Sequence, residues 1–113
     1  MNQLEDSNLG DCLNQLVLEN NKLNSIPDTV WANEHIFLLD LDNNNITSVL
    51  SSIELSKSLS KLYLSNNSLT KLPVALFALK LVTLAVDGNL LKSIPTDIGL
   101  ITSLQYFRAN NNN

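Results

Sequence analysis

The chain has 113 residues, of which 44% are hydrophobic and 16% charged, a balance typical of one globular domain rather than of a disordered segment. Its net charge of −4 argues against a surface for nucleic acid, because phosphate groups attract basic proteins. No apolar run approaches the roughly 20 residues that a membrane-spanning helix needs.

Residues 1 to 12, MNQLEDSNLGDC, differ from the rest of the chain because they lack its repeated pattern. They contain acidic residues but no Lys or Arg and no long apolar stretch, so they do not resemble a secretory signal peptide. Cys12 is the only cysteine, which excludes a disulfide within the chain. Both observations favour a reducing compartment, and we expect the protein to be intracellular and cytoplasmic.

From residue 13 onwards the sequence repeats the pattern L-x-x-L-x-L-x-x-N-x-L, with other apolar residues in place of some leucines. A new copy begins every 22 or 23 residues. The copies begin at Leu13, Ile36, Leu59, Leu81 and Leu104, and the last copy is incomplete. A fixed period of this length indicates one structural unit that stacks on copies of itself.

The L-x-L core of each copy alternates with a period of two, which predicts a short strand. A strand of three or four residues is not stable alone, so we expect the strands to lie parallel and side by side, one per copy. The residues expected to point into the core are Leu16 and Leu18, Leu39 and Leu41, Leu62 and Leu64, Leu84 and Val86, and Phe107 and Ala109.

On these spacings the chain resembles the leucine-rich repeat family across residues 13 to 112. The resemblance implies an α/β fold, a right-handed solenoid with a curved parallel sheet on its concave side. Short helical, 3₁₀ or extended segments would form the convex side, because a repeat of 22 or 23 residues has no room for long helices. Residues 1 to 12 would form an N-terminal cap and residues 13 to 113 the repeats.

One asparagine follows each predicted strand at the same place in every copy. These residues are Asn21, Asn44, Asn67, Asn89 and Asn112. In leucine-rich repeats the stacked side chains of this position satisfy backbone groups in the buried turn, each of which would cost roughly 1 to 3 kcal/mol if left unpaired. We therefore interpret this set as a structural asparagine ladder.

The return segment of each copy begins with an apolar residue, which a proline follows in three of the first four copies. Proline fixes φ and stiffens the turn. The second copy carries Leu50 in this place, and it carries Ser56 where the third and fourth copies have a second apolar residue. We therefore expect the convex side of the second copy to be the loosest.

Trp31 and Phe77 occupy equivalent places in the return segments, each four residues after a proline. One interpretation is that both side chains pack beneath the convex turns. The alternative is a second contact patch, since large apolar side chains are costly to expose without a partner.

The residues between the core positions point outward, and leucine-rich repeat proteins use this concave face to bind partners. The candidate partner-binding residues are Gln15, Val17, Glu19, Leu38, Asp40, Asp42, Lys61, Tyr63, Ser65, Thr83, Ala85, Asp87, Tyr106 and Arg108. The first half of this set is acidic, and the second half holds tyrosines and an arginine, residue types favoured in interface hot spots. The resemblance thus predicts a non-catalytic interaction scaffold whose protein partner has a basic patch. The alternative is a face whose charges only keep the sheet soluble.

No arrangement of residues indicates catalysis. His35 is the single histidine, and no nucleophile or metal ligand is spaced to serve it, so we expect neither an enzyme nor a metal or cofactor site. Two other interpretations stay open: a regulatory or substrate-recognition part of a kinase, ubiquitin ligase or GTPase regulator, or a piece of a receptor ectodomain. An uncapped last repeat would also permit edge-to-edge association between chains.

Overall fold

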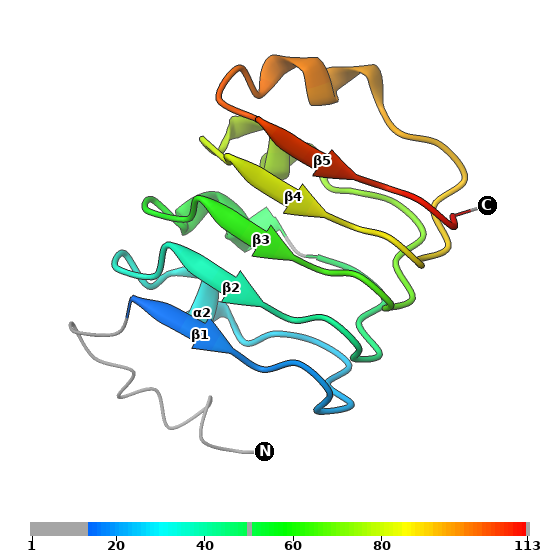
Figure 1. Ribbon diagram of the computed structural model, residues 1–113. Coiled ribbons are helices and arrows are strands. Elements are labelled where there is room, and N and C mark those ends of the chain that lie inside the picture. Colours follow the sequence, from blue (N-terminus) through cyan, green and yellow to red (C-terminus); the bar gives the residue numbers. More distant parts are fainter. Residues whose placement is uncertain (1–13, 50, 113) are drawn as a thin grey trace.

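The computed structural model describes residues 14–49 and 51–112, and the expected N-terminal cap at residues 1 to 12 lies outside this part. Within it, five strands of three residues each form one parallel sheet. In chain order they are β1 (Gln15–Val17), β2 (Leu38–Asp40), β3 (Lys61–Tyr63), β4 (Thr83–Ala85) and β5 (Tyr106–Arg108). Figure 1 shows each strand beside the next, with β1 at one end of the stack and β5 at the other.

Between consecutive strands the chain returns through a short helical turn (Figure 1). The first turn is α-helical, α2 (Asp28–Trp31), and the next three are 3₁₀ helices: η1 (Ser51–Leu55), η2 (Val74–Ala78) and η3 (Thr96–Leu100). A proline directly precedes α2, η2 and η3, with φ values of −60°, −74° and −59°. Proline is suited to this place because the first N–H groups of a helical turn have no partner within it.

Apolar side chains from the strands and the return segments fill the interior between the two sides. The inward strand residues of the three middle repeats are at most 1% exposed: Leu39, Leu41, Leu62, Leu64, Leu84 and Val86. Leu16, Phe107 and Ala109 in the first and last repeats are only partly buried. This difference is expected, because a terminal repeat of a stack has a neighbour on one side only.

Three residues of the return segments that the repeat pattern does not explain lie inside the molecule. Trp31 is 2% exposed and Phe77 is 7% exposed, so they pack beneath the turns, and the alternative that they form a contact patch is wrong. Ser56 is buried as well, and its hydroxyl donates a hydrogen bond to the carbonyl of Trp31. The serine in the second return segment therefore joins that segment to the first.

The asparagines after the second to fifth strands bind backbone groups in two repeats at once, whereas the Nδ2 of Asn21 donates to the carbonyls of Leu18 and Glu19 in its own turn. The Nδ2 of Asn67 donates to the carbonyls of Leu64 and Ser65 in its own turn, at 3.1 and 3.2 Å. It also donates to the carbonyl of Leu41 at 3.0 Å, and its Oδ1 accepts from the N–H of Ile46 at 3.0 Å, both in the preceding repeat. The same arrangement recurs at Asn44, Asn89 and Asn112.

The residue before each of these asparagines has a left-handed backbone conformation. Its φ lies between 58° and 67° at Asn20, Asn43, Asn66, Gly88 and Asn111. Gly adopts this region without strain, and Asn tolerates it better than most residues do. The paired asparagines in the sequence therefore serve two purposes, the first setting the turn and the second linking the repeats.

Replacing Asn67 by alanine is expected to lower the free energy of unfolding by about 3 kcal/mol or more. The substitution leaves one N–H and several carbonyls without a partner, and each buried unpaired group costs about 1 to 3 kcal/mol. Asn45→Ala is the control, because Asn45 is exposed in the same turn, and its effect should stay within about 0.5 kcal/mol. Urea unfolding followed by circular dichroism measures both, and equal losses would contradict a special contribution from Asn67.

Replacing Gly88 by alanine is expected to cost about 1 to 2 kcal/mol, because φ is +67° there and a side chain disfavours this region. The added Cβ would also stand 2.2 Å from the Oδ1 of Asn66, which must move. Gly99→Ala is the matched control, since its Cβ would meet no atom within 4 Å. A Gly99 variant that unfolds as easily as the Gly88 variant would show that the turn conformation is not the cause.

Candidate functional site

The sheet brings the predicted surface residues into rows that cross the strands. The first row joins Gln15, Leu38, Lys61, Thr83 and Tyr106, and the second joins Val17, Asp40, Tyr63, Ala85 and Arg108. We call these two rows the sheet face. A third row, which we call the turn row, follows two residues beyond the second and holds Glu19, Asp42, Ser65, Asp87 and Asn110. Since neighbouring strands lie about 4.8 Å apart, each row is about 19 Å long.

Several side chains of the sheet face are open to solvent. Tyr106 is 63% exposed, Val17 is 55% exposed, and the side chain of Arg108 is 68% exposed. Gln15 and Lys61 are exposed too, while four further members are half-buried: Leu38, Asp40, Tyr63 and Thr83. Ala85 is 5% exposed, so it offers almost no surface to a partner.

The side chains of the turn row bind the backbone of the next repeat. Asp42 Oδ1 accepts from the N–H of Ser65 at 2.7 Å, and Ser65 Oγ accepts from the N–H of Asp87 at 3.2 Å. Asp87 Oδ1 accepts from the N–H of Asn110 at 2.7 Å. The sequence predicts these residues as partner contacts, whereas the structure shows three of them hydrogen-bonded within the fold. They form a second polar ladder beside the asparagines.

An ion pair connects the sheet face to the turn row. Arg108 Nη2 lies 2.9 Å from Asp87 Oδ2, and the aspartate side chain is only 14% exposed. A pair with one solvated partner contributes little to stability, on the order of 1 kcal/mol at most. Its main consequence is positional, because it holds the guanidinium at the C-terminal end of the sheet face.

Carboxylates gather at the N-terminal end of the turn row. Burial raises the pKa of Asp42 above its ordinary value of 3.8, although the hydrogen bond from Ser65 acts in the opposite direction. The negative charges of Asp40, Glu19 and Asp87 raise the pKa of Asp42 further. Negative charge on Asp42 is therefore unfavourable to the fold itself.

The single histidine and the acidic residues are candidates for other kinds of site. His35 is exposed, and its backbone N–H donates to Asn33 Oδ1. Across residues 14–49 and 51–112, no three His, Cys, Asp or Glu side chains gather in a way that could hold a metal ion. In the same ranges no helix has the length and apolar character to cross a bilayer.

Comparison with known proteins identifies the repeat. Residues 58–79 match the model of the Leucine Rich Repeat family. The solved structure of a leucine-rich-repeat protein from Leptospira interrogans is similar, with a TM-score of 0.67 and 24% identity over 88% of this chain. The matched region is 32% of that protein's chain, and no curated protein matches this sequence. The predicted leucine-rich-repeat solenoid is confirmed as the fold.

Stability should fall with rising pH through the titration of Asp42. Because burial raises its pKa in the folded state, the folded protein binds the proton more tightly than the unfolded chain does. The contribution of this group is therefore greatest below pH 3.8 and is lost as the pH rises through the folded pKa.

Asp42→Asn keeps an oxygen for the N–H of Ser65 but carries no charge. We expect the variant to be more stable than the wild type at pH 7 and equally stable near pH 3, as measured by urea unfolding at both values. Glu19→Gln is the control for net charge, because Glu19 is exposed in the same row. If Glu19→Gln gained as much stability at pH 7 as Asp42→Asn, the effect would come from net charge alone.

Proposed function

We propose that the chain is a non-catalytic interaction module that binds a protein partner on its sheet face. Leucine-rich repeats in general provide surfaces for protein–protein interaction, and this chain has their fold. The observation that carries the proposal is the exposure of the sheet face, where Val17, Tyr106 and Arg108 all keep more than half of their side-chain surface open. The residues that hold the repeats together lie in the core and the two ladders. The two rows of the sheet face can therefore vary without loss of the fold.

The N-terminal end of this surface favours a partner with Lys or Arg. Asp40 is half-buried on the sheet face, and its neighbours in the turn row are Glu19 and Asp42. The raised pKa of Asp42 reflects the repulsion among these groups as well as burial. A basic side chain placed there would offset that repulsion and speed association by electrostatic steering.

The middle and the C-terminal end of the surface offer aromatic anchors. Tyr63 pairs in register with Asp40 on one side and with Ala85 on the other, so its ring lies at the centre of the second row. Tyr106 lies at the end of the first row beside Thr83. Tyrosine and arginine are enriched among residues that dominate interface energies. With a small, buried alanine between the larger groups, this end suits a protein surface better than an enclosed small-molecule site.

The same face would serve in two larger settings. In one the repeats recognise a substrate or regulator for a signalling enzyme, and in the other they form part of a receptor ectodomain. Both share the binding surface and differ only in what is attached to it. We also propose an intracellular location and edge-to-edge association of two chains through β5.

Photo-crosslinking tests the location of the surface. With p-benzoylphenylalanine in place of Tyr63 or Tyr106, we expect a covalent adduct with the partner in lysate of the source cell. Val74 and Leu100 are the control positions, because they are 75% and 69% exposed and lie in the return segments. Equal adducts from the control positions would contradict binding on the sheet face.

The adduct identifies the partner, so the purified pair can then be measured. Asp40→Lys combined with Tyr63→Ala should weaken binding by about 30-fold or more, as the loss of a hot-spot residue does. Asp42 is left unchanged in this variant because it accepts from the N–H of Ser65 in the next repeat, whereas Asp40 accepts from the N–H of Asp42 within its own turn, so its replacement leaves the contacts between repeats intact. Undiminished affinity, with both proteins folded by circular dichroism, would remove these residues from the site.

A further inference from the structure

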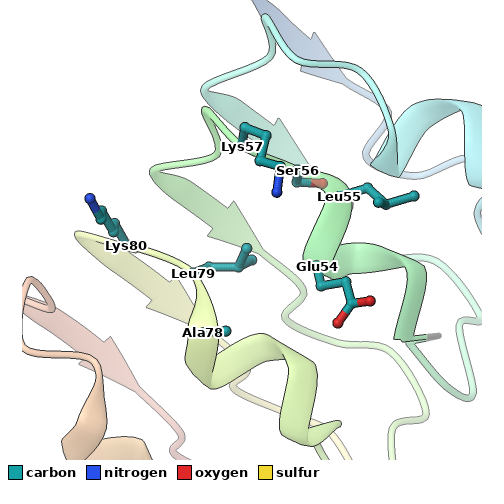
Figure 2. Close-up of a pocket in the computed structure, with 7 residues that line it drawn as sticks. All are labelled: Glu54, Leu55, Ser56, Lys57, Ala78, Leu79 and Lys80. Atoms are coloured by element: carbon teal, nitrogen blue, oxygen red, sulfur yellow. The ribbon is translucent and has the colours of Figure 1, made fainter.

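A pocket lies between the second and third return segments, away from the sheet face. It has a volume of about 490 Å³ and is lined by residues 54–57 of one repeat and residues 78–80 of the next (Figure 2). Volumes of roughly 300 to 1,000 Å³ are typical of ligand sites. We call this hollow the reverse pocket.

Ser56 lines the reverse pocket, and later return segments have a larger apolar residue at the equivalent position. Ser56, Leu79 and Ile101 are structurally equivalent, since each donates its backbone N–H to the carbonyl three residues earlier. The hydroxyl of Ser56 donates a hydrogen bond to the carbonyl of Trp31, in the preceding return segment. Leu79, whose side chain points between η1 and η2 in Figure 2, lines the pocket from the third return segment.

Two lysines stand at equivalent positions on the rim of the pocket. Lys57 follows Ser56, and Lys80 follows Leu79, and both are exposed. No ion pair forms at either lysine among the residues that the structure describes. The equivalent residues of the first and fourth return segments are Glu34 and Thr102. Of the four return segments, only the two beside this pocket therefore have a lysine at this position.

The remaining lining residues add one carboxylate and several apolar groups to the pocket. Figure 2 shows the carboxylate of Glu54 directed away from both ammonium groups. Lys57, Lys80 and Glu54 give the lining a formal charge of +1, whereas the whole chain has a net charge of −4. Ala78 is exposed and Leu55 is 44% exposed, so apolar surface is open next to the two charges.

We infer that the reverse pocket binds an acidic peptide segment of a protein partner. A carboxylate of the segment would lie between Lys57 and Lys80, and an apolar side chain would rest on Leu79 and Ala78. Charge complementarity selects the acidic group, because the long side chains of two exposed lysines at equivalent positions of adjacent repeats can both turn to one carboxylate. The apolar surface between the segments selects a peptide over a small anion, which would leave that surface uncovered. This site is separate from the sheet face.

The probe for the test is a fluorescein-labelled hexapeptide, Gly-Glu-Glu-Leu-Glu-Gly, whose binding is followed by fluorescence anisotropy at low salt. We compare a Lys57→Glu, Lys80→Glu variant with a Lys71→Glu, Lys92→Glu variant. The two carry the same net charge, and Lys71 and Lys92 are exposed outside the reverse pocket. The first should bind the peptide at least about tenfold more weakly than the second, because only it reverses the charges that would touch the ligand.

Two further measurements separate a pocket from a diffuse attraction. Ala78→Trp fills the pocket without changing charge and should weaken binding about as much as loss of both lysines. A peptide with serine in place of leucine should bind about tenfold more weakly, because leucine burial is lost. Tyr63→Ala on the sheet face should leave the affinity unchanged, so failure of this site and failure of the proposed function are distinguishable. Equal affinities of the two double variants, or no saturable binding to the wild type, would overturn the inference.

Discussion

The hydrogen bonds that pass from one repeat to the next are the interaction on which this structure depends. Each strand has three residues, too few to be stable alone, and each return segment is a single turn. The side chain of Asn67 binds the carbonyl of Leu64 in its own turn and the carbonyl of Leu41 in the preceding repeat. Since both carbonyls are buried with the core, the amide removes a cost of about 1 to 3 kcal/mol for each. The asparagine side chain therefore holds adjacent repeats together and also pairs their buried carbonyls.

The turn row extends this principle to residues that also shape the surface. Asp42 and Asp87 accept backbone N–H groups of the following repeat, so they cannot change freely with the partner. Each repeat needs a hydrogen-bond acceptor at this position, but the acceptor need not be charged, because the neutral Ser65 serves as well. An aspartate here supports the stack through its oxygen and adds negative potential to the surface at a cost in burial. The turn row thus links adjacent repeats, whereas on the sheet face Asp40 accepts only within its own turn, from the N–H of Asp42.

Local departures from the repeat account for both candidate surfaces. The sheet face gains its character from residues between the core positions, where Tyr63 and Tyr106 replace smaller groups. The reverse pocket is lined by Ser56 and Lys57 in one repeat and by Leu79 and Lys80 at the equivalent positions of the next. A repeat fold tolerates such changes because each one alters contacts with its nearest neighbours only. The two surfaces can therefore serve two partners without interfering with each other.

The sequence by itself determined the strands, their register and the inward residues, because a period of two combined with a period of 22 or 23 leaves only one way to bury the repeated apolar residues of the strands on one face. It also indicated the asparagine positions, since an amide can donate and accept in one buried turn. Only the tertiary structure decided that Asp42 and Ser65 are acceptors, that Ala85 is covered, and that Ser56 bonds to Trp31. The partner atoms of these contacts lie 22 to 25 residues away, in the adjacent repeat. A pattern along the chain shows which face a side chain takes, but only the packed repeats show which atom it meets.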